Sequence, residues 1–99
     1  MRTALIAAAL CAFAPMTATA GPIDSACLKS NRSTSPIICD CIQRVANMTL
    51  TSSDQQLAAK LLRDPEKVQD IAYSNRASHR EFWVRYTNFG AAAEQVCAN

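Results

Sequence analysis

The chain has 99 residues, with ten Lys and Arg against eight Asp and Glu and a formal net charge of +2 at pH 7. This length suits one domain, and the small charge lacks the basic excess with which proteins bind nucleic acid or acidic membrane surfaces. After residue 20, no apolar run approaches the roughly 20 residues that a bilayer-spanning helix needs. Composition therefore argues against nucleic-acid binding and against a membrane-embedded body after that point.

The first 20 residues have the pattern of a secretory signal peptide. Arg2 gives a short positive start, an apolar stretch of 11 residues runs from Ala4 to Ala14, and Ala18-Thr19-Ala20 has the small-x-small form of a cleavage site. We predict cleavage between Ala20 and Gly21 rather than a lipid anchor on Cys11. Residues 21–99 are then expected to form a single helical domain, exported to the periplasm or the extracellular space.

Helix signals begin directly after this segment. Gly21-Pro22 is an extended lead-in, and Ile23 to Lys29 predicts a short helix that carries Cys27. A polar turn follows over residues 30–34, and Ser35-Pro36 then has the form of an N-cap followed by proline at the first helical position. The second helix has one apolar face at three- and four-residue spacing, made of Ile38, Cys41, Ile42, Val45 and Thr49.

The middle of the chain predicts two more helices. Ser52 or Ser53 can cap a helix, with a glutamine three residues further on. The apolar side of this helix is made of Leu57, Leu61 and Leu62. Asp64-Pro65-Glu66 marks a break, because an N-cap residue, a proline and an early acid begin a new helix. The short helix that follows has Val68, Ile71 and Ala72 facing inward.

The last segment predicts the longest helix. Ser78 and Glu81 form a capping box, and the stripe behind it steps by four, three, four and three residues. Its members are Phe82, Tyr86, Phe89, Ala93 and Val96. No alternating pattern of a strand is present. We therefore predict an all-α fold, a small disulfide-stapled array of four or five short helices with the longest, aromatic helix at the C-terminus.

Four cysteines follow the signal peptide: Cys27, Cys39, Cys41 and Cys97. An even number in a small exported chain predicts two disulfides. On a helix, positions 39 and 41 point about 200° apart, which makes a bond between them the least favoured pairing. A hairpin that turns near Arg32 places Cys27 opposite Cys39, so we predict Cys27–Cys39 and Cys41–Cys97. Cys41 is expected to face the core and Cys39 to lie on the flank.

The Cys-x-Cys pair has two functional alternatives. It can bind a soft metal such as copper(I), with His79, Cys27 and Cys97 as further ligands, but strong zinc sites use two close-spaced pairs and the chain has one. It can also act in redox chemistry, although Asp40 between the sulfurs opposes a low thiol pKa. His79 is the only histidine, and the sequence pairs it with no convincing nucleophile and no glycine-rich loop. We predict no metal, no cofactor and no enzymatic activity.

One segment suggests a binding surface, formed by Arg76, Arg80, Trp83 and Arg85. Arginines beside an aromatic ring can hold an anion, a carboxylate of a partner or a lipid head group. The plainer interpretation is that the arginine stems cover aromatic edges and pair with Glu81 or Asp70.

The chain also resembles a group of short exported bacterial proteins of unknown function. The resemblance is carried by Ala26-Cys27, Cys39-Asp40-Cys41-Ile42-Gln43, Asp64-Pro65, His79, Phe82-Trp83 and Arg85-Tyr86. Some members carry the label "arginine transporter", which implies a transport-associated role. Two hypotheses stand: an interaction or accessory module that engages another periplasmic or secreted protein, and a binding protein for a small ligand such as an amino acid. A Cys-x-Cys metal or redox protein is the third.

Overall fold

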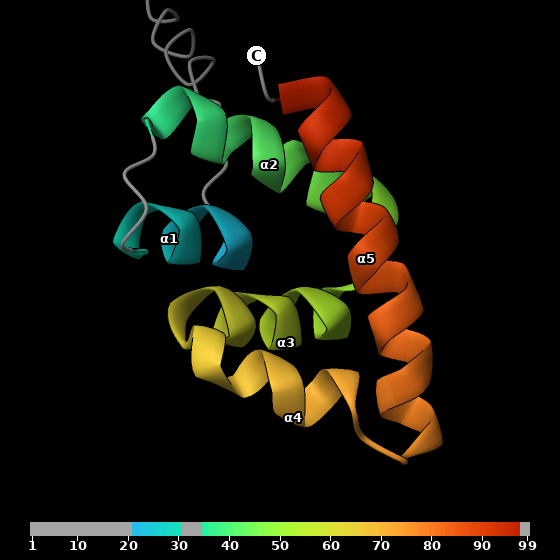
Figure 1. The fold of residues 1–99 in the computed structure, drawn as a ribbon. Helices are drawn as coiled ribbons and strands as arrows, with labels where there is room; N and C mark the ends of the chain where they lie inside the picture. The colour runs from blue at the N-terminus through green and yellow to red at the C-terminus, as the bar shows by residue number, and fades with distance from the viewer. Residues whose placement is uncertain (1–20, 31–34, 98–99) are drawn as a thin grey trace, which may run out of the picture.

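The computed structural model describes residues 21–30 and 35–97, and within them five α-helices, one 3-10 turn and no strand (Figure 1). The elements are α1 (Pro22–Lys29), α2 (Pro36–Thr49), α3 (Ser52–Arg63), η2 (Pro65–Lys67), α4 (Val68–Ala72) and α5 (Ala77–Cys97). The all-α fold with its longest helix at the C-terminus is thus confirmed. The predicted signal peptide, including Cys11, and the turn around Arg32 lie outside the described residues.

Four of the helices form a stack, and the fifth crosses it. Figure 1 shows α2, α1, α3 and α4 lying one beside the next, with α5 running along one side of the stack. Helix α1 packs against both α2 and α3, whereas α5 packs mainly against α2 and α4. An isolated helix as short as the eight residues of α1 is not stable in water. It persists here because Ile23 and Ala26 are completely buried between its neighbours.

Two helix boundaries follow the local sequence as predicted. The Ser35 hydroxyl accepts a hydrogen bond from the Ile38 backbone N–H at 3.2 Å, with Pro36 at the first helical position. The Asp64-Pro65 break separates α3 from the short turn η2 and α4.

Two other caps differ from the prediction. Helix α3 is capped by Thr51, whose hydroxyl accepts from the Asp54 N–H at 3.1 Å, and not by Ser52 or Ser53. Helix α5 begins one residue before Ser78, because the Arg76 carbonyl already accepts from the backbone N–H of Arg80 at 3.0 Å. A hydroxyl one residue away from the true cap cannot be distinguished from it by sequence spacing alone.

The core combines aliphatic side chains of the stack with the aromatic stripe of α5. Phe82 and Phe89 are buried, and the Tyr86 ring lies 5.3 Å from the Phe82 ring and 6.0 Å from the Phe89 ring. Val96 was expected on this stripe but is 65% exposed, and buried Cys97 closes the end of the helix instead. The remaining buried aliphatic residues are Ile23, Ala26, Val45, Ala46, Leu50, Ala58, Ala59, Leu61 and Ile71.

Both predicted disulfides are present, Cys27–Cys39 and Cys41–Cys97. The expected position of Cys39 on the flank is wrong, whereas Cys41 packs against the core as expected. Cys39 is completely buried and Cys41 only half-buried. The reason is that α2 contacts the stack and α5 at once, so it buries a second face beside the predicted stripe. Thr49, expected to be inward, is exposed.

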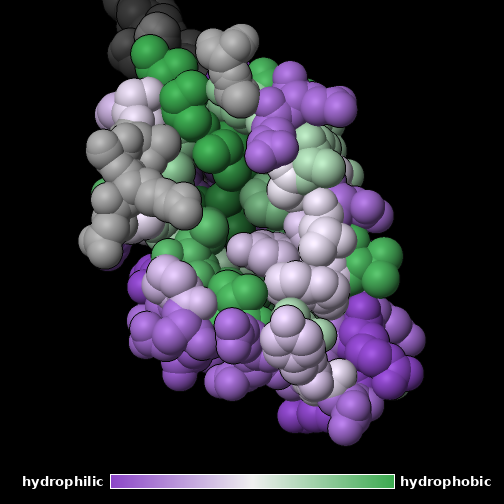
Figure 2. All heavy atoms as spheres, viewed as in Figure 1, coloured by the Kyte–Doolittle hydropathy of each residue, from purple (hydrophilic) through white to green (hydrophobic). Residues whose placement is uncertain are grey.

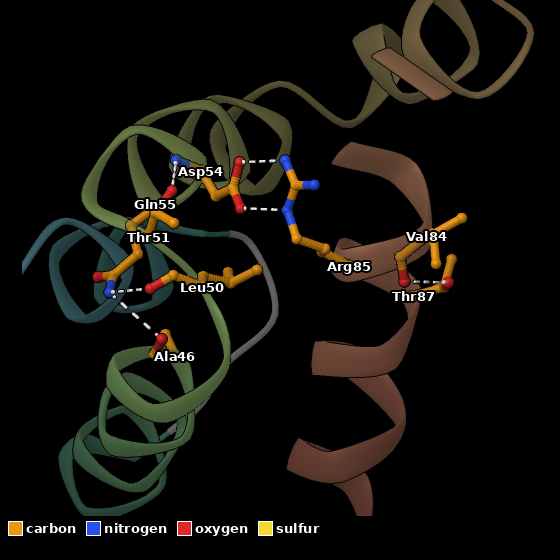
Figure 3. Close-up of polar contacts among 8 residues, drawn as sticks. All are labelled: Ala46, Leu50, Thr51, Asp54, Gln55, Val84, Arg85 and Thr87. Atoms are coloured by element: carbon orange, nitrogen blue, oxygen red, sulfur yellow. Dashed lines mark hydrogen bonds and ion pairs between the residues drawn. The ribbon is translucent and has the colours of Figure 1, made fainter. Parts of the chain in front are cut away.

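The second face of α2 carries a buried amide network that the apolar pattern did not reveal. Gln43 is 3% exposed, and its Oε1 accepts from the Asp24 N–H at 2.9 Å. Its Nε2 donates to Gln55 Oε1 at 2.8 Å and to Asn47 Oδ1 at 2.9 Å. Gln55, also buried, donates in turn to the carbonyl oxygens of Ala46 and Leu50 (Figure 3). Side chains from α2 and α3 therefore link three helices through satisfied hydrogen bonds.

Within residues 21–30 and 35–97, no helix combines the length and the apolar character needed to cross a membrane.

Candidate functional site: an apolar groove

A groove of about 820 Å³ opens on the face of the molecule where α5 crosses the stack. Figure 2 shows hydrophobic side chains gathered in a hollow in the middle of this face, with hydrophilic residues around it. Its size lies within the usual range of ligand pockets, roughly 300–1,000 Å³. The apolar side chains that line it are Ile42, Leu61, Leu62, Pro65, Val68, Phe89, Ala91 and Ala93.

Helix α5 forms one wall of the groove. Tyr86, Phe89, Gly90 and Ala93 line it, and their spacing of three and four residues places them on one side of the helix. A Cβ atom added at Gly90 would meet no other atom within 4 Å. The missing side chain at this position therefore keeps the groove wide where α5 passes over it.

Two polar side chains on this wall differ in what they offer a ligand. Thr87 Oγ1 donates to the Val84 carbonyl at 3.1 Å, so its proton is used within the helix (Figure 3). Tyr86 lines the same wall, and burial raises the pKa of its phenol above its ordinary value.

The opposite wall is made by the end of α3 and the break that follows it. Leu61 is buried and Leu62 is half-buried, and Pro65 and Val68 continue the surface after the chain turns. Proline at this position ends α3, because its ring removes a backbone donor and clashes with a continuing helix. The turn thereby brings α4 beside α3 and extends the apolar wall.

Three charged side chains also line the groove: Lys29, Arg63 and Glu94. All three are exposed, and none forms an ion pair within the described parts of the chain. Lys29 and Arg63 are in the last turns of α1 and α3. These helices run side by side in the same direction and end on the side away from α5 (Figure 1). The groove therefore has two cations at one end and an acid on the α5 wall.

The binding surface expected from sequence is only partly assembled. Arg85 Nε and Nη2 donate to the two carboxylate oxygens of Asp54 at 2.7 and 3.0 Å (Figure 3). This contact lowers the pKa of the buried Asp54 carboxyl and raises the pKa of Arg85. Arg76 is nine residues earlier, on the opposite side of the helix. Arg85 therefore serves to join α5 to α3 and faces away from Arg76.

The other members of that surface lie near the start of α5. Arg76 and Arg80 are exposed, and Arg80 donates to the Asn75 carbonyl at 3.3 Å. Trp83 is half-buried, packs against the core, and its ring lies 5.6 Å from the Tyr86 ring. The expected partners Glu81 and Asp70 form no ion pair with these arginines in the structure of the described residues.

The remaining candidates from the sequence stay separate. His79 Nδ1 lies 2.8 Å from Ser74 Oγ, a local contact at the start of α5. Across residues 21–30 and 35–97, no group of three or more His, Cys, Asp or Glu side chains is arranged to hold a metal ion. The four cysteines of the described residues are all in disulfides, so the Cys-x-Cys pair presents no thiol in this structure.

Sequence reasoning found part of the groove but not the groove itself. Leu61, Leu62 and Phe89 were expected as apolar positions, but only the packing shows that space remains between them. The sequence offered one signal for the groove, which was Gly90 beside Phe89 in the aromatic helix. A glycine weakens a helix interior, so its presence there usually has a packing or functional reason. The rim charges gave no sequence signal beyond their places in final helical turns.

Comparisons of the chain with family models, with curated proteins and with solved structures find no match.

Proposed function

We propose that the chain is an exported, non-enzymatic binding protein whose working site is the apolar groove between the stack and α5. The observation that carries this is the groove itself: about 820 Å³ lined mainly by apolar side chains. The groove is open to solvent, so its apolar side chains contact water, and a bound apolar group that covers them would contribute about 25 cal/mol per Å² of apolar area removed from water.

Export is supported by the pattern of residues 1–20 and by the two disulfides, which form and persist in oxidising compartments. The interaction surface around Arg76, Arg80 and Trp83 receives less support, because Arg85 is already paired and the Trp83 ring packs on the core. Free arginine is a poor fit to the groove, since its guanidinium needs carboxylates to replace water. Glu94 is the only carboxylate in the lining.

A neutral fluorescent apolar probe, N-phenyl-1-naphthylamine, tests the proposal with the purified, disulfide-bonded protein. We expect saturable binding with enhanced emission. Gly90→Leu should place a side chain into the groove and weaken binding at least about tenfold, a change of roughly 1.4 kcal/mol. Gly90→Ala is the matched control, because it gives a similar gain in helix propensity with little added volume.

Both Gly90 variants are expected to fold, since a Cβ at this position meets no atom within 4 Å. They should also melt higher than the wild type, because replacing a glycine inside a helix stabilises it by up to about 1 kcal/mol. Absence of probe binding to the wild type would refute the proposed function. Equal binding by Gly90→Leu and the wild type would place the site elsewhere.

A further inference from the structure

The groove is electrically asymmetric along its length. Lys29 and Arg63 lie at the ends of α1 and α3, away from α5, whereas Glu94 lies on the α5 wall. Cations in the last turn of a helix are stabilised by the helix dipole, which accounts for a basic residue at each of these positions. It does not account for both of them lining the same apolar groove. Their shared position gives one end of the groove a local positive charge.

Within residues 21–30 and 35–97, neither cation has an ion-pair partner. Acidic side chains there form ion pairs with Arg44 and with Arg85 but not with Lys29 or Arg63. A carboxylate bound by an arginine and a lysine forms charge-assisted hydrogen bonds, about twice as strong as neutral ones. Glu94 would repel an anion at the α5 wall. The charges thus favour one orientation of an anionic ligand.

The rest of the lining selects for hydrocarbon. The apolar lining includes Leu61, Leu62 and Val68 on the stack and Phe89 on α5, which have no polar side-chain atoms. Burying each methylene group of a ligand against such a surface contributes about 0.8 kcal/mol. A compact anion would leave this surface unused, whereas a chain of methylene groups would cover it.

We propose that the groove binds a free, single-chain alkyl carboxylate, with its carboxylate between Lys29 and Arg63 and its chain along Leu61, Val68 and Phe89 towards α5. This inference rests on the proposed function and adds the class of ligand and its orientation. Gly90 then provides the width where the chain passes under α5.

The test compares two ligands of equal chain length, dodecanoate and dodecanol, as competitors of N-phenyl-1-naphthylamine below their aggregation limits. The wild type should bind dodecanoate about tenfold more tightly than dodecanol. Lys29→Gln/Arg63→Gln should remove this preference and leave dodecanol affinity unchanged. The matched control is Lys60→Gln/Lys67→Gln, which removes the same net charge from residues outside the groove lining and should keep the preference.

Removing the charge of Glu94, the acid on the α5 wall, should change dodecanoate affinity in the opposite direction. Glu94→Gln should tighten dodecanoate binding about two- to threefold and leave dodecanol unchanged. All of these substitutions are at exposed positions, so thermal melting should show that the variants remain folded.

The possible outcomes test the class of ligand and the location of the site separately. Equal affinity of the wild type for dodecanoate and dodecanol would overturn the alkyl carboxylate while leaving an apolar groove. Equal loss of dodecanoate affinity in both double variants would also overturn it, because only general charge would then matter. Co-sedimentation with anionic phospholipid vesicles without competition by dodecanoate would assign the groove to a membrane surface instead. Failure of the neutral probe itself to bind would remove the proposed function as well.

Discussion

Gln43 provides the sharpest test of how this small domain is held together. Its side-chain amide is 3% exposed and forms hydrogen bonds with groups on three helices. In Gln43→Ala, the Asp24 N–H at the start of α1 would lose its acceptor and the buried Gln55 Oε1 would lose its donor. Asn47 Oδ1 would still accept from Gln55 Nε2 at 3.2 Å.

The size of the effect follows from these orphaned groups. A buried polar group left without its partner costs about 1–3 kcal/mol, so two of them suggest roughly 2–6 kcal/mol. The total stability of a domain is only about 5–15 kcal/mol. In a domain of this size, 1 kcal/mol corresponds to a shift in Tm of about 4–8 °C. Gln43→Ala should therefore lower the Tm by about 10 °C or more.

Urea unfolding followed by circular dichroism, with the disulfides intact, measures the difference in free energy of unfolding. Gln56→Ala is the matched control, because Gln56 is exposed on α3 and alanine is the better helix former. This control should be neutral or slightly more stable than the wild type. A Gln43→Ala variant within about 1 kcal/mol of Gln56→Ala would refute the argument that the amide network is a structural requirement.

Three further changes test other contacts. Gly21→Ala should destabilise the domain by about 1–2 kcal/mol in urea unfolding, because its Cβ would lie 2.5 Å from an amide oxygen of the buried network; an unchanged midpoint would mean that the amide moves aside. Cys41→Ser opens a disulfide with a sequence separation of 56 and should cost about 4 kcal/mol by loop entropy, against less than about 1 kcal/mol for Lys60→Ser; equal melting would contradict the staple. Arg85 lowers the folded-state pKa of Asp54, so the stabilisation by this pair is complete above the unfolded-state pKa, about 3.9, and is lost as the pH falls through the folded-state pKa. The stability difference between the wild type and Asp54→Asn should therefore be constant above about pH 5 and shrink below about pH 4; a difference that persists at lower pH would contradict it.

The features predicted correctly from sequence are local ones. Ser35-Pro36 begins a helix and Asp64-Pro65 breaks one, because capping and the proline ring act within a few residues. The disulfide pairing also came from local geometry: two short helices joined by a turn place Cys27 opposite Cys39, and the remaining pair follows.

The errors occur where one helix contacts several others. A single apolar stripe on α2 left Cys39 on the flank, but α2 packs on α1 with one face and on α5 with another, and Cys39 is completely buried. The first of these faces includes Gln43, a residue type that is usually exposed. Gln43 can be buried because groups on α1 and α3 form hydrogen bonds with its amide. The spacing of residues in α2 does not indicate those partners.

The candidate site could not be predicted from the sequence for the same reason, because it depends on contacts between several helices. Arg85 was expected on an open surface, whereas Asp54, 31 residues earlier in the chain, accepts both of its hydrogen bonds. The groove depends still more on the arrangement of helices. Most of its apolar residues, among them Leu61, Val68 and Phe89, were identified as core positions, and the sequence alone cannot distinguish a core position that is filled from one that borders a space.

The groove persists because α5 is fixed to the stack at two separate points. The disulfide between Cys41 and Cys97 joins its last residue to α2, and the ion pair between Arg85 and Asp54 joins its middle to the start of α3. The groove residues Phe89, Gly90 and Ala93 lie between these two attachments along the helix. A helix held at both sides of this segment cannot move inward to fill the space without straining one of them, and Gly90 offers no side chain to fill it. The walls are therefore already ordered in the folded protein, so less conformational entropy is lost when a ligand binds.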